Sequence, residues 1–412
     1  MASPNRWGLA LLVLVGSLSA DAAAPRPAEK AGSRPAVELR FPGHEPAARW
    51  DEAGNLHMLF VREIGNRQRL SYARGGPNPA GPVVVSAEEA SVDSRGEMGP
   101  SLEVLPGGKL VAVYTLAAAG ERNSRLVAQR SIDGGATWSR AVPVNDDGPS
   151  GSHGFAATAV DSIGELIVSW LDRRSGQQGV AFSRSRDGLH FATNRTVDPR
   201  TCQCCDTNVA AGASGSFWIA YRGLSGQDLR DVAVVRGAPA GVLTAPVTVS
   251  NDNWHINGCP ESGPRMAVEA DGTLWVAWFT GTGPGVFVSC SRDGGKTFGP
   301  RTPIAPLPGE KGLANHPDIA VLPGGKILVV YGSQATIFGR TLGNDRKTWS
   351  APITLAEDAS YARVSVNAGR SALSFTAREG NDTVAVASTA PLDSLRILSG
   401  APARSADSRA RE

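Results

Sequence analysis

A short pattern recurs seven times along this chain: a glycine, five residues, and then an aromatic residue. In each copy, a turn glycine precedes a nearly continuous apolar run, which is the pattern of a strand buried on both faces. Another apolar run precedes each glycine, so each copy predicts a hairpin between an innermost and a second strand. The copies are GNLHMLF (54–60), GKLVAVY (108–114), GELIVSW (164–170), GSFWIAY (215–221), GTLWVAW (272–278), GKILVVY (325–331) and GRSALSF (369–375).

A second pattern marks a polar turn after the third predicted strand in four of the repeats. It reads SIDGGATW (131–138), SRDGLHF (185–191), SRDGGKTF (291–298) and NDRKTW (344–349). In the first of these turns, Asp133 is expected to accept hydrogen bonds from turn N–H groups, and Trp138 to pack against the sheet. Four short strands in a repeat of this length predict an all-β protein, a β-propeller with seven blades, with six as the alternative.

The two ends of the repeating region explain how the ring closes. The run AVELRF (36–41) is a strand without a partner before the first repeat, and the last repeat (about 358–396) is one strand short. We therefore expect the N-terminal strand to complete the last blade, which removes two free sheet edges. The predicted propeller is a single domain over residues 36–396, with a flexible lead-in (23–35) and a disordered tail (397–412).

The first 22 residues have the features of a secretory signal peptide. Arg6 supplies positive charge, WGLALLVLVGSLS is a short apolar run, and ADA (20–22) fits a cleavage site. This predicts a secreted or periplasmic protein that meets an oxidising compartment. Neither a nucleic acid nor a membrane is expected as a partner, because 41 basic and 39 acidic residues give a net charge of +2 and no later segment reaches transmembrane length. We expect a monomer.

The polar turn signature resembles the Asp box, or BNR repeat, of the sialidase superfamily, and the resemblance covers about residues 36–396. It implies a sialidase-like propeller, in which Asp boxes are structural. It also implies a nucleophilic tyrosine paired with a glutamate, an aspartate acid/base and arginines that bind a substrate carboxylate. Tyr361 stands near the position of the family's nucleophile, and Glu45 or Glu261, at strand entries, could place a carboxylate beside it. Arg265 and Arg363 are candidate anion ligands and Asp206 is a further catalytic candidate, while His44 stands where the first arginine of the family is expected.

The stretch RTCQCCDTNV (200–209) holds three of the five cysteines. Counting nine to eleven residues back from each repeat glycine predicts which residues lie at the mouth of the central channel, and Glu97, His153, Cys204, Cys205 and Asp206 are among them. Three interpretations stay open: a disulfide from Cys202 or Cys204 to Cys259, a soft-metal site, or a nucleophilic thiol. The candidate ligands for copper or zinc are Cys202, Cys204, Cys205, Cys259, His153, His255 and His316, with His44 nearby.

Two classes of function follow from these residues. In the first, the protein binds a metal or a small-molecule, glycan or protein ligand at the channel mouth. In the second, it is a glycosidase of the sialidase type, or a lyase-like enzyme, that uses Tyr361 with Glu45 or Glu261. The sequence leaves open whether the protein is an enzyme.

Overall fold

The structure is a computed structural model. It describes residues 36–389 and 392, except for 90, 118–122, 149–150, 284, 307–312 and 368. The expected signal peptide, lead-in and tail lie outside the described residues, so these domain limits stay predictions. Among the described residues, no helix has the length and apolar character that a membrane span requires.

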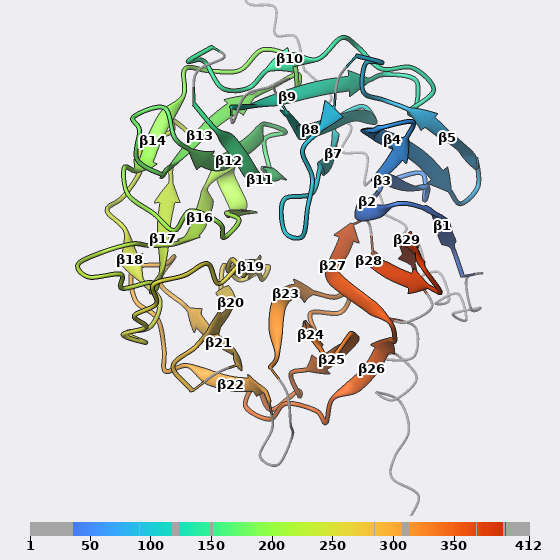
Figure 1. Cartoon of the computed structure of the whole chain (residues 1–412). Helices are drawn as coiled ribbons and strands as arrows, with labels where there is room; N and C mark the ends of the chain where they lie inside the picture. The colour runs from blue at the N-terminus through green and yellow to red at the C-terminus, as the bar shows by residue number, and fades with distance from the viewer. Residues whose placement is uncertain are drawn as a thin grey trace, which may run out of the picture. The chain divides into compact units, whose positions relative to one another are not determined.

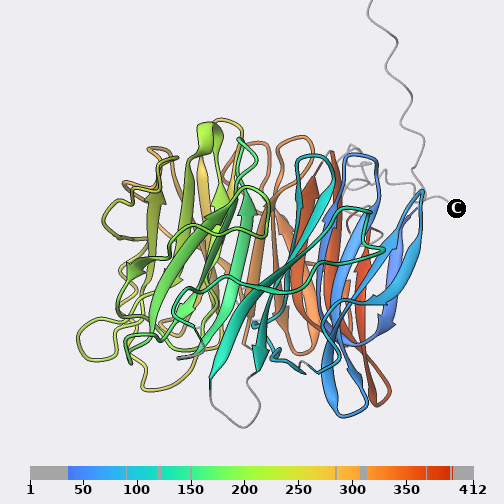
Figure 2. The ribbon, with the colours of Figure 1, turned by 90° about the horizontal axis from the view of Figure 1, so that it is seen from above.

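The described part of the chain from Ala36 onward forms seven antiparallel sheets around a common centre, as predicted (Figure 1). The first strand of each sheet lies nearest the centre. The strands run along the depth of the ring, which is visible when the molecule is turned by 90° (Figure 2).

In each sheet the strands follow one another in chain order, except for β6 (Ser91–Val92) in the second sheet and β1 (Glu38–Pro42) in the seventh. The first comprises β2 (His44–Trp50), β3 (Leu56–Ile64), β4 (Arg67–Gly75) and β5 (Ala80–Val84). The second comprises β7 (Ser101–Leu105), β8 (Lys109–Ala117), β9 (Ser124–Ser131) and β10 (Val142–Pro143), with β6 (Ser91–Val92) also paired to β8. The third comprises β11 (His153–Val160), β12 (Leu166–Asp172), β13 (Gly179–Ser185) and β14 (Arg195–Asp198).

The remaining sheets repeat this arrangement. The fourth comprises β15 (Asn208–Ala211), β16 (Phe217–Arg222), β17 (Val232–Gly237) and β18 (Val247–Thr248), with the 3-10 helix η1 (Ala213–Gly215) connecting β15 to β16. The fifth comprises β19 (Arg265–Val268), β20 (Leu274–Thr280), β21 (Gly285–Ser291) and β22 (Thr302–Ala305). The sixth comprises β23 (Asn315–Val321), β24 (Ile327–Ser333), β25 (Thr336–Thr341) and β26 (Ile353–Ala356). The seventh comprises β27 (Ala359–Asn367), β28 (Arg370–Glu379), β29 (Asp382–Ser388) and β1 (Glu38–Pro42).

The repeat glycines lie in the turns between the first and second strands, which confirms the predicted hairpins. All seven have positive φ, from 69° at Gly369 to 89° at Gly54, a conformation that glycine adopts without strain. The aromatic residue that ends each repeat is buried between neighbouring sheets: Phe60, Tyr114, Trp170, Tyr221, Trp278, Tyr331 and Phe375.

The N-terminal strand closes the ring, as the sequence predicts. Strand β1 pairs antiparallel with β29, with Leu39 opposite Ala387. Leu39 also packs in one cluster with Trp50 and Leu56 of the first sheet. The first and seventh sheets are therefore joined by both backbone pairing and apolar packing.

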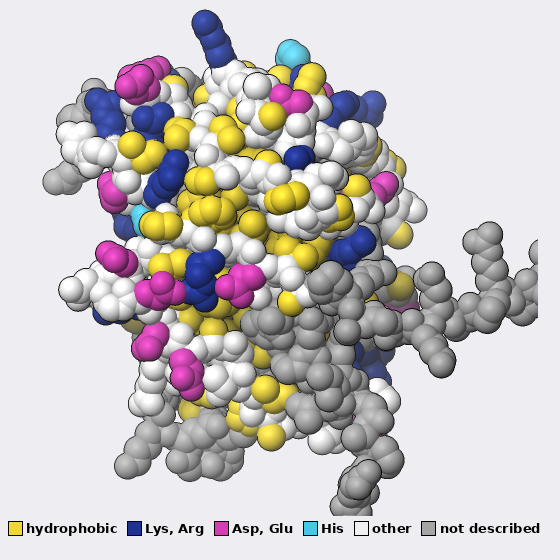
Figure 3. Space-filling view, turned by 90° about the vertical axis from the view of Figure 1, so that its right-hand side faces the viewer, with side chains coloured by type: hydrophobic (Ala, Val, Ile, Leu, Met, Phe, Trp, Pro, Cys, Tyr) yellow, Lys and Arg dark blue, Asp and Glu magenta, His cyan; other side chains and the backbone are white. Residues whose placement is uncertain are grey.

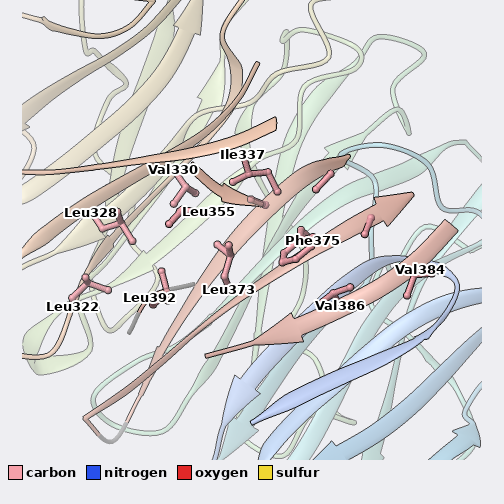
Figure 4. Packing of buried hydrophobic residues seen from close by; sticks show 13 residues of the cluster. Leu322, Leu328, Val330, Ile337, Leu355, Leu373, Phe375, Val384, Val386 and Leu392 are labelled. Atoms are coloured by element: carbon pink, nitrogen blue, oxygen red, sulfur yellow. The ribbon is translucent and has the colours of Figure 1, made fainter. Parts of the chain in front are cut away.

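Apolar side chains fill the spaces between neighbouring sheets. Figure 4 shows one such cluster, in which Leu328, Val330 and Ile337 of the sixth sheet face Leu373 and Phe375 of the seventh. On the outer side seen in Figure 3, positive and negative side chains are interspersed, so that face shows no extended patch of a single charge.

The Asp-box turns have the structural role that the sequence predicts for them. In the first, Asp133 accepts a hydrogen bond from the Thr137 N–H group (2.9 Å), and the Ser131 hydroxyl accepts one from the Gly135 N–H group (2.8 Å). Trp138 packs on the apolar cluster between the first and second sheets. These bonds hold the turn closed and leave its side chains away from the channel.

Candidate functional site

The inner strands surround a central cavity of about 220 Å³. Five residues predicted as catalytic or ligand-binding lie in its wall: Glu45, Asp206, Arg265, Tyr361 and Arg363. They come from the first, fourth, fifth and seventh sheets, or from the segments that lead directly into them. The repeat register therefore brings together residues that are up to about 300 positions apart in the sequence.

A bulge at the start of the inner strand aims several of these side chains. The pairing register shifts at this point in β2, β23 and β27. The bulged residues are Glu45, His316 and Tyr361, with φ of 43°, 47° and 55°. Non-glycine residues in this conformation are uncommon, and they concentrate at functional sites, where a bulge redirects a side chain.

Glu97 and Asp206 form the acidic centre of the cavity. The Glu97 carboxylate accepts a hydrogen bond from the Gly263 N–H group (2.7 Å), and its other oxygen lies 3.1 Å from His316 Nδ1. Asp206 forms an ion pair with Arg265, and both side chains are buried. A side chain at position 263 would collide with Asp206, so glycine is needed at that position.

The two carboxyl groups have pKa values that are shifted in opposite directions. Burial, and to a smaller extent the negative charge of Glu97, raise the pKa of Asp206 to about 8. The positive charge of Arg265 acts to lower it but is outweighed. Burial also acts to raise the pKa of Glu97, but the hydrogen bonds from His316 and Asp206 and the charge of Arg265 lower it overall. The raised pKa of Asp206 favours its protonated form, which could serve the cavity as a proton donor.

Arg363 lies beside this pair with unused donors. Its Nη2 atom is 3.6 Å from Asp206 and 3.8 Å from Glu97, too far for a hydrogen bond. Nη1 donates to the Ala362 carbonyl oxygen (3.0 Å), and a quarter of the side chain is exposed. Burial, and then repulsion from Arg265, lower the pKa of Arg363. The charges of Asp206 and Glu97 oppose this effect, and an anion bound to the exposed part of Arg363 would add to them.

Tyr361 lies against His316, with the two ring centroids 4.6 Å apart. Its hydroxyl lies over Gly96, whose N–H group donates to Glu45 (2.8 Å). Burial, and then the negative charges of Glu97, Glu261 and Glu45, raise the pKa of Tyr361. The phenol is therefore protonated at neutral pH and needs a base in order to act as a nucleophile.

The sequence analysis missed Arg49, which also lines the cavity. Its Nη2 and Nε atoms lie 3.1 and 3.3 Å from the Glu103 carboxylate. Glu103 also accepts a hydrogen bond from Thr158 (2.8 Å). Arg49 lies within β2, several residues after the position where the family pattern expects its first arginine. Arg49 follows Ala47 by two residues, so the two side chains lie on the same face of the strand. This alternation along the strand is the signal that could have identified Arg49.

The other predicted residues around the cavity occupy less central positions. His44 forms a contact with the Glu45 carboxylate rather than lying in the cavity wall. His316 is in contact with Glu97 and Tyr361, as described above. Glu261 is exposed and has a φ of 46°, and it acts on Tyr361 through its charge.

A disulfide joins Cys204 to Cys259, with their Cα atoms 6.1 Å apart. It links the segments that precede β15 and β19 in neighbouring sheets, which confirms the disulfide interpretation. Cys202 and Cys205 are free, buried thiols whose Sγ atoms are 3.5 Å apart. The hydrogen bond between Cys202 and Cys205 is the main cause that lowers the pKa of Cys202 to about 5. The Cys204 N–H group and two arginines also lower it, while burial opposes them.

The histidines predicted as metal ligands do not join the cysteines. Among the described residues, the cysteine cluster of possible metal ligands is Cys202, Cys204 and Cys205, without a histidine. His153 lies in a separate group, where its ring nitrogens face the Ser124 carbonyl oxygen (2.8 Å) and Asp147 (3.0 Å). His255 is exposed, and its Nδ1 atom is 2.7 Å from the Gln227 carbonyl oxygen.

Comparison with solved structures shows that the chain has the sialidase-like β-propeller fold. The BP39L lectin from Burkholderia pseudomallei superposes with a TM-score of 0.61 at 13% identity, covering 84% of this chain and 96% of the lectin. An ulvan lyase bound to GlcA(1-4)Rha3S gives 0.58 at 11% identity, covering 84% and 93%. The NanB sialidase from Streptococcus pneumoniae gives 0.50 at 10% identity, covering 86% and 94%. No family model matches the chain, and no curated protein matches it in sequence.

Proposed function

We propose that the protein binds an anionic glycan in the central cavity, through the carboxylate of an acidic sugar. The observation that carries this proposal is the pair Arg265 and Arg363 in the cavity wall, of which Arg363 is a quarter exposed and makes ion pairs too long for hydrogen bonds with Asp206 and Glu97. A sugar carboxylate would accept charge-assisted hydrogen bonds from Arg363 and relieve the repulsion between the two cations. Asp206, as a protonated acid, and Tyr361 would donate to further sugar oxygens.

The fold and the disulfide support this proposal. The three structural neighbours named above are a lectin, a lyase and a sialidase, and their names refer to carbohydrates. We extend carbohydrate binding to this chain as part of the proposal. The Cys204–Cys259 disulfide favours the expected export, since such bonds persist in oxidising compartments.

Calorimetry with paired oligosaccharides tests the proposal. Each acidic oligosaccharide, containing a uronic or sialic acid, is compared with the same sugar after reduction of its carboxylate to an alcohol. Arg363→Gln is expected to weaken binding of the acidic form by roughly 10- to 100-fold, which corresponds to the loss of charge-assisted hydrogen bonds. The control is Arg186→Gln, because the Arg186 side chain is 85% exposed and lies outside the cavity wall. Equal affinity for the acidic and reduced sugars, or unchanged binding by Arg363→Gln, would contradict the proposal.

A second candidate function is hydrolysis of a glycosidic bond, favoured by Tyr361 and Glu45 meeting at Gly96. In this proposal Tyr361 is the nucleophile, Glu45 or Glu261 is its base, and Asp206 donates a proton to the leaving oxygen. The raised pKa of Tyr361 works against this chemistry, because the phenol must lose its proton.

We expect release of sialic acid from a simple fluorogenic sialoside to be absent or very weak. His44 stands in place of the first arginine, and two nitrogens of Arg49 are already engaged by Glu103. Loss of one charged partner from a carboxylate clamp weakens binding by about a hundredfold. The measurement is the initial rate with and without Tyr361→Phe. Rapid release that this variant abolishes would show that the prediction is wrong and that the second candidate function is right.

A further inference from the structure

Two buried arginines, Arg222 and Arg230, lie beside the cysteine cluster. Arg222 is 1% exposed, and its guanidinium donates to the carbonyl oxygens of Ser262, Arg230 and Phe279 at 2.7 to 3.3 Å. Within the part of the chain that the structure describes, no acidic side chain forms an ion pair with Arg222. A buried cation without a counter-charge is costly, so a negative group is needed nearby.

The second cation, Arg230, points at the sulfur atoms. Its Nη1 atom donates to Cys202 Sγ (3.1 Å), and its buried Nε atom has no partner among the described residues. Arg230 also forms an ion pair with Asp228 (3.6 Å), whose side chain is half exposed, and the charge of Arg222 acts on Asp231. These two carboxylates supply part of the compensating negative charge, and the cysteines, which lie against Arg230, can supply more.

The sulfur atoms are spaced for a metal ion. Cys202 Sγ lies 3.5 Å from Cys205 Sγ and 4.0 Å from Cys204 Sγ, and all three atoms lie within 4.8 Å of one another. An ion about 2.3 Å from each sulfur would make S–metal–S angles of roughly 100° and 120° across these two pairs. Such angles suit three-coordinate ligation, and no fourth His, Cys, Asp or Glu of the described residues joins the cluster.

We propose that Cys202, Cys204 and Cys205 form a three-thiolate site for Cu⁺ that opens when the Cys204–Cys259 disulfide is reduced and closes when it forms. Soft thiolate ligands select Cu⁺. Three thiolates and one Cu⁺ carry a charge of −2, which the neighbouring positive charges of Arg222 and Arg230 would stabilise. In the oxidised protein Cys204 is committed to the disulfide, so only two of the three ligands remain.

The redox step is a thiol–disulfide exchange with a dithiol reductant. The reductant transfers two electrons and two protons to the Cys204–Cys259 bond and becomes a cyclic disulfide, leaving two thiols. Cu⁺ then displaces the protons of Cys202, Cys204 and Cys205, and Cys259 stays a free thiol. The site is separate from the central cavity, so failure of this proposal leaves the glycan proposal untouched.

Cys259→Ser gives a direct test, because it frees Cys204 without any reductant. Under anaerobic conditions, Cu⁺ is titrated in competition with a chromogenic Cu⁺ chelator. We expect Cys259→Ser and the dithiol-reduced wild type to bind one Cu⁺ per chain, at least 100-fold tighter than the oxidised wild type. X-ray absorption should report sulfur ligands only. Cys290→Ser, which alters the cysteine on β21 outside the cluster, should bind like the wild type in both redox states.

Two further measurements decide the ligands and the ion. The double variant Cys202→Ser/Cys259→Ser should lose tight binding while keeping the circular dichroism and thermal unfolding of Cys259→Ser. Equal Cu⁺ affinity of the double and single variants would overturn the site. If Cys259→Ser binds Cu⁺ no more tightly than the oxidised wild type does, the disulfide does not control the site. Displacement of bound Cu⁺ by an equal concentration of Zn²⁺ would overturn the choice of a monovalent ion.

Discussion

Replacing Arg265 with methionine is expected to lower the free energy of unfolding by about 3 to 5 kcal/mol. Arg265 is 4% exposed and pairs with Asp206, which is itself buried and lies next to Glu97. Removing the guanidinium leaves both acidic groups without their main positive neighbour, and methionine fills a similar volume without carrying charge. Urea unfolding at neutral pH measures the change.

Two companion variants separate this effect from a general loss of a surface charge. Arg40→Met breaks an ion pair with Glu379 whose side chains are about half exposed, so it should cost less than about 1 kcal/mol. Arg265→Met/Asp206→Asn should recover part of the lost stability, because it removes the carboxyl group that Arg265 contacts directly. If Arg265→Met is no less stable than Arg40→Met, the buried ion pair does not have the role assigned to it.

The stability of the protein is expected to fall as the pH rises from about 5 to about 8, and Asp206→Asn should flatten this fall. The pKa of Asp206 is raised from its ordinary value of 3.8 to about 8. Between these values the folded protein holds a proton that the unfolded chain has lost, so the free energy of unfolding decreases with rising pH, by up to a few kcal/mol. The contribution of Glu97 has the opposite sign, since its pKa is lowered: it is present above 4.5 and is lost only as the pH falls below that value.

Denaturant unfolding of the wild type and Asp206→Asn at several pH values between 5 and 8.5 measures this difference. Asp382→Asn, at an exposed position at the start of β29, is the matched control and should keep the pH dependence of the wild type. Parallel curves for the wild type and Asp206→Asn would mean that Asp206 does not hold the proton.

The fold could be predicted from the sequence because each repeat contains the same short sequence signals for a turn and a buried strand. A glycine such as Gly272 marks the turn, and an aromatic such as Trp278 marks the end of the buried strand six residues later. The missing partner of the run at 36–41 was enough to predict that it pairs with the last sheet. These signals are local, and the repetition of one unit turns them into a global architecture.

The site was predictable only where the repeat register fixed a position. Counting back from the glycines placed Glu97 and Asp206 at the cavity, but it could not show the bulge that turns Tyr361 and His316 toward each other. It also placed His153 at the channel mouth, whereas the side chain is held by Ser124 and Asp147. Counting from the repeat glycine predicts the position of a residue along its strand. Bulges and hydrogen-bond partners determine where its side chain points.

The pairing of β1 with β29 makes the two ends of the ring neighbours, and this has a practical consequence for engineering. The Val37 N–H group donates to the Thr389 hydroxyl, and the Thr389 N–H group donates to the Val37 carbonyl oxygen, both at 3.1 Å. A short glycine-rich linker from 389 to 37 would therefore suffice for circular permutation, with new termini opened in a loop between two other sheets. The last and first strands of the chain would then be joined by a covalent turn, and the chain termini could be placed between any other two sheets.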